Sequence, residues 1–199
     1  MKFILGKKMG MSQVFNEKGG IVAVTLVEAG PCVVTQLKTK EKDGYGAVQL
    51  GFDELKPKKA KKTQKGKPFR YLKEYRCHKE ECTFCAGDKV DVTFFEEGDI
   101  VKVSGISKGK GFQGAVKRHG FKGRQSKTHG TKHELRTIGS VGSSFPERVI
   151  KGKRMPGHMG VERVTVKNLR IAKIDKEKNI MAIGGALPGK RGTLLEIQG

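Results

Sequence analysis

Short runs of apolar and β-branched residues recur at both ends of the chain and predict β-strands rather than long helices. Residues 21–27 show the pattern, because Val22, Val24 and Leu26 fall on one face. Turn residues separate the runs, and the stretch from Asn16 to Gly20 predicts a hairpin. We expect strands at residues 11–15, 21–27, 32–37, 47–52, 90–95, 100–106, 164–174, 180–183 and 194–197. Strands at this spacing are typical of a β-barrel or a sandwich.

Two stretches interrupt the strand pattern in the N-terminal half. Residues 56–67 contain seven lysines and no acidic residue, which predicts a surface loop that is either solvated or ordered by RNA. The stretch from Pro68 to Tyr75 predicts a short helix with proline in its first turn. We therefore expect residues 56–88 to form a basic loop followed by a small insert that contains a helix and cysteines.

The segment from Ser104 to Gly160 shows no clear helical or strand period. It contains few large apolar side chains, twelve glycines, and thirteen lysines or arginines against two glutamates. Such a segment cannot bury enough apolar surface to offset the entropy of ordering itself. We predict a mainly β fold in which residues 1–106 and 161–199 form one β-barrel domain. Residues 107–160 form a long basic extension inserted into it.

The formal net charge of the chain is +21, and the central segment carries a large share of it. An excess of cations on this scale indicates a polyanionic partner rather than a particular fold. Nucleic acid fits better than a membrane, because no apolar run approaches the ~20 residues of a spanning helix and no long basic amphipathic helix is visible. The N-terminus shows no signal or transit pattern, so we expect a cytoplasmic protein with four reduced cysteines.

Residues Gly109 to Gly114 match the pattern G-x-G-x-x-G. In dinucleotide-binding proteins this loop opens a helix within a β-α-β unit. Here Gly120 soon interrupts the chain, and no β-α-β alternation occurs elsewhere. The glycines are better explained by close approach of bare backbone to phosphates, whose charge Lys108 and Lys110 neutralise.

Histidine and phenylalanine residues lie among the cations of the same segment. His129 and His133 are followed by Glu134, which is not the zinc-hydrolase order H-E-x-x-H. The histidines are more simply explained as donors to phosphate or ribose, or as rings that stack on bases. Phenylalanine rings either stack on bases or brace the segment through small clusters. The residues concerned are His119, His129, His133, His158, Phe112, Phe121 and Phe145.

One stretch offers a candidate metal site. Cys77, His78, Cys82 and Cys85 provide three thiolates and an imidazole, and the last two cysteines have the spacing of a zinc knuckle. All four lie on one short stretch without a second knuckle elsewhere, so a set of reduced thiols is the alternative to zinc.

No catalytic set is visible in the sequence. A Walker A loop, a G-x-S-x-G elbow and an acidic cluster for magnesium are all absent. We therefore expect a non-enzymatic RNA-binding protein without a small-molecule substrate or, zinc aside, a cofactor. A free basic RNA chaperone is the alternative that composition leaves open.

The stretch from Ser107 to Phe121 resembles the bacterial-type large-subunit ribosomal protein L-three family. Further matches follow the family order at residues 6–15, 128–130, 139–142, 151–160, 162–169 and 185–189. The resemblance implies a translation-protein-type β-barrel with a smaller α+β insert. It also implies a structural constituent of the large ribosomal subunit that binds near the 3′ end of the large rRNA and helps nucleate assembly. The extension would reach toward the peptidyl transferase centre, and proteins L-fourteen and L-nineteen would be neighbours.

Two regions depart from the family pattern. Residues 77–85 are unlike the usual family sequence, and the family holds no metal there. At the expected tip of the extension, Ser143, Ser144, Phe145 and Pro146 lack the glutamine that some bacterial members carry in methylated form. That modification is therefore not expected here.

The predicted rRNA-binding residues fall into two groups. The barrel domain contributes Lys7, Lys8, Lys58, Lys59, Lys61 and Lys62. The extension contributes Lys108, Lys110, Phe112, Lys117, Arg118, His119, Lys122, Arg124, Lys127, His129, Lys132, Arg136, Arg148, Lys151, Lys153, Arg154 and His158. Phosphate contacts position a protein but carry little sequence information, so the shape of folded RNA should supply the specificity.

Overall fold

The computed structural model describes residues 2–15, 19–64, 66–77, 84–125 and 129–199. Residues 16–18 of the predicted hairpin turn lie outside them. The chain divides into two compact units, unit 1 with residues 1–106 and 163–199 and unit 2 with residues 107–162. Strands dominate the described residues, which confirms the mainly β class. No described helix is long and apolar enough to span a membrane.

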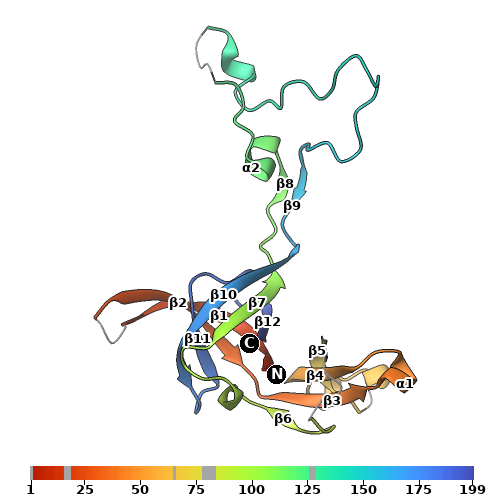
Figure 1. Cartoon of the computed structure of the whole chain (residues 1–199), viewed down its shortest axis with the longest axis vertical. Helices are drawn as coiled ribbons and strands as arrows, with labels where there is room; N and C mark the ends of the chain where they lie inside the picture. The colour runs from red at the N-terminus through yellow and green to blue at the C-terminus, as the bar shows by residue number, and fades with distance from the viewer. Residues whose placement is uncertain (1, 16–18, 65, 78–83, 126–128) are drawn as a thin grey trace. The chain divides into compact units, whose positions relative to one another are not determined.

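Six antiparallel strands of unit 1 close into a barrel, in the order β1-β12-β7-β10-β11-β2 (Figure 1). In the sequence, strands β1 and β2 come from the N-terminal end of the chain, and β10, β11 and β12 come from the C-terminal end, as the strand pattern predicted. The strands are β1 (Phe3–Phe15), β2 (Ile21–Ala29), β7 (Ile100–Ile106), β10 (Arg163–Asp175), β11 (Ile180–Gly184) and β12 (Leu194–Gln198).

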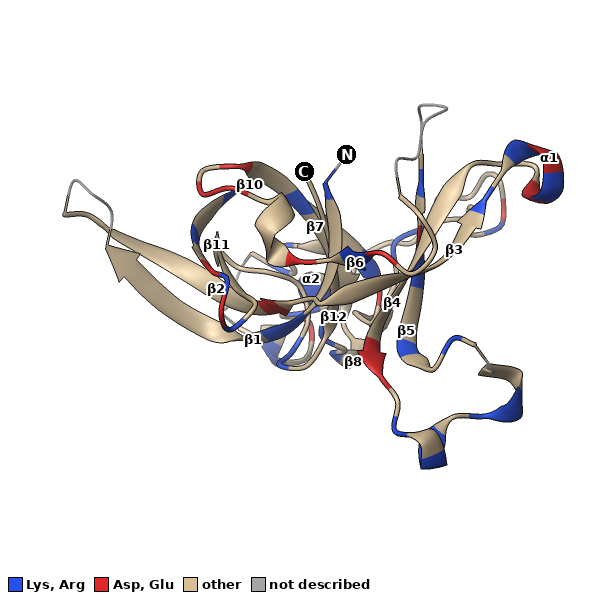
Figure 2. Cartoon of the chain, turned by 90° about the horizontal axis from the view of Figure 1, so that it is seen from below, with Lys and Arg blue, Asp and Glu red and all other residues tan. Residues whose placement is uncertain are grey.

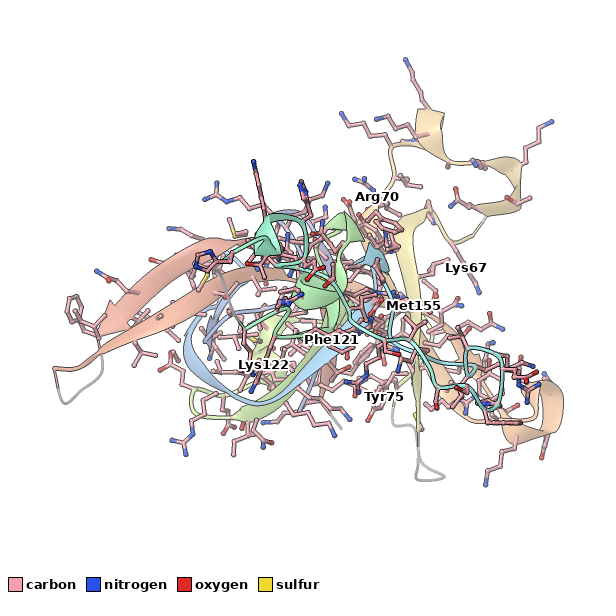
Figure 3. All side chains as sticks on the ribbon, turned by 90° about the horizontal axis from the view of Figure 1, so that it is seen from above. Lys67, Arg70, Tyr75, Phe121, Lys122 and Met155 are labelled. Atoms are coloured by element: carbon pink, nitrogen blue, oxygen red, sulfur yellow. The ribbon has the colours of Figure 1, made fainter. Side chains whose placement is uncertain are left out.

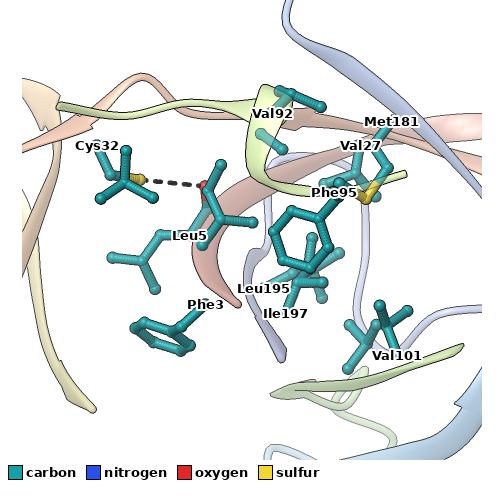
Figure 4. Close-up of a cluster of buried hydrophobic side chains, with 14 of the residues drawn as sticks. Phe3, Leu5, Val27, Cys32, Val92, Phe95, Val101, Met181, Leu195 and Ile197 are labelled. Atoms are coloured by element: carbon teal, nitrogen blue, oxygen red, sulfur yellow. Dashed lines mark hydrogen bonds between the residues drawn. The ribbon is translucent and has the colours of Figure 1, made fainter. Parts of the chain in front are cut away.

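Alternation along these strands fills the barrel with side chains. Leu195 and Ile197 on β12 are fully buried, and Val103 on β7 is buried beside them. Phe95 closes the same cluster (Figure 4). The residues between the buried positions, such as Glu196, therefore face outward. Burial of this apolar surface is the main stabilising contribution to unit 1.

A buried thiol lies at the edge of the core. Cys32 is fully buried, and its thiol donates a hydrogen bond to the backbone oxygen of Leu5 at 3.5 Å (Figure 4). Burial raises the pKa of this thiol from 9.0 to about 12. The thiol therefore stays neutral in the folded protein at physiological pH.

A second sheet of unit 1 has the order β5-β4-β3-β6 and shares the hydrophobic core with the barrel. Tyr75 stacks on Phe3 with ring centroids 4.8 Å apart, and Tyr71 stacks on Phe52 at 6.5 Å. The elements are β3 (Cys32–Lys38), α1 (Lys40–Asp43), β4 (Ala47–Glu54), the 3-10 turns η1 (Pro57–Lys59) and η2 (Lys62–Gln64), β5 (Phe69–Arg76) and β6 (Lys89–Val90).

The predicted helix from Pro68 to Tyr75 is wrong, because this stretch forms strand β5. Tyr71 and Tyr75 are four residues apart, a spacing that suits one face of a helix and also one face of a strand. Antiparallel pairing with β4 decides between them, since it brings both rings onto the core. Tertiary contacts here override the local preference.

The predicted strand at residues 90–95 is also wrong for most of its length. Only Lys89 and Val90 form a strand, and they pair with β3. The 3-10 turn η3 (Val92–Phe94) follows and buries both Val92 and Phe95. Residues three apart lie on the same side of a 3-10 helix, whereas a strand would direct them to opposite faces.

Unit 2 contains short elements that the sequence pattern did not predict. Strands β8 (Gly111–Gln113) and β9 (Gly157–Met159) pair antiparallel, and helix α2 (Ala115–His119) and the 3-10 turn η4 (Thr131–His133) follow β8. Among the described residues of this unit, only Ala115 and Thr131 are buried. Unit 2 thus has local hydrogen-bonded structure but very little core.

Candidate nucleic-acid interface

Most of the cations predicted to bind RNA lie exposed on unit 2. Its short ribbon and single turns leave no interior in which long side chains could be buried. The exposed predicted residues are Lys108, Lys110, Lys117, Lys122, Arg124, Lys132, Arg136, Arg148, Lys151, Lys153, Arg154, His129 and His158. Lys127 lies outside the described residues.

Ten of these cations form no ion pair or side-chain hydrogen bond with any residue that the structure describes, and four of the ten are Lys122, Lys132, Arg136 and Arg148. The other six are grouped along the chain. They flank the β8–β9 ribbon, the helix α2 and the turn near residue 152. They are Lys108, Lys110, Lys117, Lys151, Lys153 and Arg154. Unpaired cations on an exposed backbone are available to neutralise phosphates and to release the counterions bound to them.

Arg118 and His119 are used differently from their neighbours. The Arg118 guanidinium donates to the backbone oxygen of Met155 at 2.8 Å, and His119 Nε2 lies 3.1 Å from the same oxygen. The His119 ring also lies 6.0 Å from that of Phe121, which is half-buried (Figure 3). Both residues brace helix α2 against the returning chain, so these predicted RNA contacts have internal partners.

Arg124 also has a partner within unit 2, because its guanidinium forms an ion pair with Glu134. The backbone of Gly123 lies against the carbonyl of Leu135, where a side chain would clash. At Gly160, which has a positive φ, a Cβ would likewise collide with the backbone oxygen of Lys108. Some glycines of unit 2 therefore allow close approach of the chain to itself and not only to a phosphate.

Two aromatic rings of unit 2 are available to stack on bases. Phe112 is 76% exposed and Phe145 is 83% exposed, whereas Phe121 contributes to the brace around His119. Phe145 lies within the predicted tip of Ser143, Ser144, Phe145 and Pro146, all of which are exposed. Exposed rings of this kind add roughly 1–3 kcal/mol for each base that stacks on them.

The glycine-rich loop opens a short helix, which ends before Gly120. Helix α2 begins at Ala115 with Gly114 at its N-cap, but it spans only five residues. The strands on either side of it, β8 and β9, pair antiparallel, whereas a dinucleotide fold requires parallel strands. The described geometry therefore does not form a dinucleotide site.

The predicted lysines of unit 1 divide into exposed and engaged groups. Lys58, Lys59, Lys61 and Lys62 are exposed on the η1–η2 loop, which shows several blue stretches and no red in Figure 2 and has side chains directed away from the ribbon in Figure 3. Lys7 Nζ lies 2.6 Å from Asp53 Oδ2. Lys8 Nζ donates to the backbone oxygens of Leu187 and Gly189 at 2.6 and 3.1 Å. Lys7 and Lys8 thus hold unit 1 together, and sequence alone did not reveal these contacts.

The candidate zinc site is only partly described, because His78 and Cys82 lie outside the described residues. Cys77 is disulfide-bonded, and Cys85 carries an exposed free thiol. The prediction of four reduced cysteines is therefore wrong for Cys77. A sulfur in a disulfide also has no thiolate with which to bind zinc. No group of three potential ligands is found among the described residues. A zinc site requires reduction of Cys77 and stays a prediction.

Comparisons with known proteins show what the chain is similar to. The family described as ribosomal protein L3 matches residues 87–186. The large ribosomal subunit protein uL3 of Carboxydothermus hydrogenoformans is 48% identical over 99% of this chain and 96% of its own length. The uL3 proteins of Desulfitobacterium hafniense (49% identical, 98% of this chain, 93% of the relative) and Pelotomaculum thermopropionicum (47%, 99% and 96%) are equally similar.

Proposed function

Because this chain belongs to the ribosomal protein L3 family and is a protein of the large ribosomal subunit, we propose that unit 2 binds folded rRNA through its exposed cations. The supporting observation is the set of six cations, Lys108, Lys110, Lys117, Lys151, Lys153 and Arg154, that have no partner among the described residues. These side chains would each contact a phosphate. The RNA would provide the packing that unit 2 lacks.

The remaining parts of unit 2 have complementary roles in this proposal. Arg118, His119 and the ion pair of Arg124 keep the ribbon and its turns in shape before RNA binds. Phe112 and Phe145 provide exposed faces for unstacked bases. The lysines of the η1–η2 loop add a second, sequence-independent phosphate contact from unit 1.

The resemblance to the family supports a finer assignment within the subunit. The chain would bind near the 3′ end of the large rRNA and help to nucleate assembly, with the tip of residues 143–146 directed toward the peptidyl transferase centre. Proteins L-fourteen and L-nineteen would be its neighbours in the cytoplasmic ribosome. The role is structural and not enzymatic, because unit 2 supplies positioned charge rather than a nucleophile with its base.

The salt dependence of RNA binding tests this proposal. If six cations each neutralise one phosphate, the logarithm of the association constant should fall with the logarithm of salt with a slope of roughly −4 to −5. The probe is a fragment of bacterial large-subunit rRNA, and the measurement is filter binding of the full chain across a salt series. A slope near −1 would refute the proposal.

A pair of charge-matched variants locates the contacts. K108Q/K110Q/K151Q/K153Q should reduce the steepness of the slope by about 3, since four phosphate contacts are lost. K42Q/K176Q/K178Q/K190Q removes the same charge from exposed positions of unit 1 and should leave the slope close to wild type. Equal losses in the two variants would mean that net charge, and not unit 2, drives binding.

A further inference from the structure

The outer wall of unit 1 carries a basic hollow that the sequence analysis did not identify. Its volume is about 370 Å³, and strands β5, β7, β10 and β12 surround it. Its lining includes Lys73, Lys102, Arg163, Glu196 and Gln198. All of them lie outside unit 2 and outside the η1–η2 loop.

Strand register brings these residues together from distant parts of the sequence. Leu195 and Ile197 point into the barrel, so Glu196 and Gln198 point outward on the same strand. Gln198 is paired with Lys102 on β7, and Ser104 on β7 contacts Thr165 on β10 through their hydroxyl groups at 2.7 Å. Unit 1 thus forms this wall from three adjacent barrel strands.

One carboxylate fixes two cations at the hollow. Glu196 is only 13% exposed, and its Oε1 lies 3.1 Å from Lys73 Nζ while its Oε2 contacts the Arg163 guanidinium. The Lys73 and Arg163 side chains are nevertheless 47% and 58% exposed. An ammonium has three donors and a guanidinium has five, so donors remain that the carboxylate does not use.

A third cation, Lys102, has no partner among the described residues and is exposed. The other acidic residue of the hollow, Glu74, accepts from Lys38 at 2.9 Å and from Tyr45 at 2.9 Å. Its charge is therefore largely compensated by Lys38 on β3. The hollow keeps an excess of positive charge with exposed donors.

We propose that this hollow binds a phosphodiester group of the large-subunit rRNA, with Lys102, Arg163 and Lys73 as donors and Glu196 as the residue that positions the last two. The proposal rests on the RNA-binding function proposed above and adds a further, pre-organised contact on unit 1. An RNA backbone fits because the donors of Lys73, Lys102 and Arg163 are exposed on the surface, where a phosphate of a large ligand can reach them. The hollow also lacks the apolar lining typical of small-molecule sites.

The test uses the full chain and the rRNA fragment of the preceding section. K102Q should weaken binding roughly fivefold to tenfold at 0.1 M salt and reduce the steepness of the salt slope by about 1. The matched control is K176Q, which removes the same charge from an exposed lysine in the β10–β11 turn and should bind as wild type does. Both changes are at exposed side chains, so neither is expected to disturb folding.

The possible outcomes separate this proposal from the one on which it rests. If wild-type protein shows no steep salt dependence, the RNA-binding function of unit 2 fails. If wild-type protein binds as expected but K102Q and K176Q are indistinguishable, only the hollow is wrongly assigned. A hollow that takes up free phosphate alone would give this second result.

Discussion

Unit 1 and unit 2 are both rich in lysine and arginine, but they use these residues in different ways. In unit 1 a continuous core includes residues from every barrel strand, and cations such as Lys7 and Lys8 are held by partners within the same unit. Among the described residues of unit 2, only two side chains are buried, and ten lysines and arginines have no ion pair or side-chain hydrogen bond. The cations of unit 2 are available to RNA because this unit has almost no core and offers them few partners within the protein.

The glycines differ between the units in a parallel way. In unit 1 the position of Gly51 leaves room for the Phe69 ring, so the glycine serves side-chain packing. In unit 2 the position of Gly160 leaves room for the backbone of Lys108. Gly51 on strand β4 of the second sheet thus makes room for a side chain, whereas Gly160 of unit 2 brings two backbones together.

The largest expected effect distinguishes two isoleucines, one in the core of unit 1 and one exposed on unit 2. Ile197→Ala removes a fully buried side chain from the barrel and should lower the free energy of unfolding by about 2–5 kcal/mol. Ile150→Ala shortens a side chain of unit 2 that is 66% exposed. This change should alter the free energy of unfolding by less than about 0.5 kcal/mol. Urea denaturation followed by circular dichroism measures both. A comparable loss in Ile150→Ala would mean that unit 2 has a core.

A smaller effect should arise from the buried thiol of unit 1. The folded-state pKa of Cys32 is about 12 and its ordinary value is 9.0, so the thiol stabilises the fold below pH 9 and this contribution is lost as pH rises toward 12. Between pH 8 and pH 10 the free energy of unfolding should fall by about 1.4 kcal/mol more in the wild type than in Cys32→Ala. The measurement is the free energy of unfolding at pH 8 and pH 10. Equal pH dependence in the two proteins would show that the thiol is not buried.

The smallest effect should separate two adjacent cations of unit 2. R118Q removes the contact with Met155 and should increase the rate of chymotrypsin cleavage within unit 2 about fivefold, equivalent to a net hydrogen bond of about 1 kcal/mol. K117Q should leave cleavage unchanged and reduce the steepness of the salt slope for RNA by about 1. Neither change creates or removes an aromatic cleavage site. Faster cleavage in K117Q together with a reduced salt slope in R118Q would contradict this assignment of the two residues.

Alternation predicted strands such as β12, in which buried and partly exposed positions alternate. It missed the first part of β1, because Phe3, Ile4 and Leu5 are buried in succession. The same method failed at Pro68 to Tyr75, where two tyrosines four residues apart suit a helix and a strand equally well. It also failed at Val92, where a 3-10 turn buries residues that a strand would separate. At Pro68 to Tyr75 pairing with strand β4 decides the local conformation, whereas at Val92 the burial of Val92 and Phe95 in the shared core decides it.

The candidate site was predictable in its location but not in the role of each residue. Charge and glycine content identified the extension, and the motif from Ser107 to Phe121 identified the family. Sequence gave no signal that Arg118 faces Met155, because the two residues are 37 positions apart. Lys73, Lys102 and Arg163 were missed for the same reason, since they come together only when β5, β7 and β10 are placed.

The sequence by itself determined that this protein is a strand-rich domain with an inserted basic segment, and that its partner is a polyanion. These properties follow from composition and from patterns that span fewer than about twenty residues. Only the tertiary structure decided which cations are engaged within the protein and which are free to bind. A charge becomes paired through a neighbour that is close in space, and the barrel brings together residues that the chain keeps far apart.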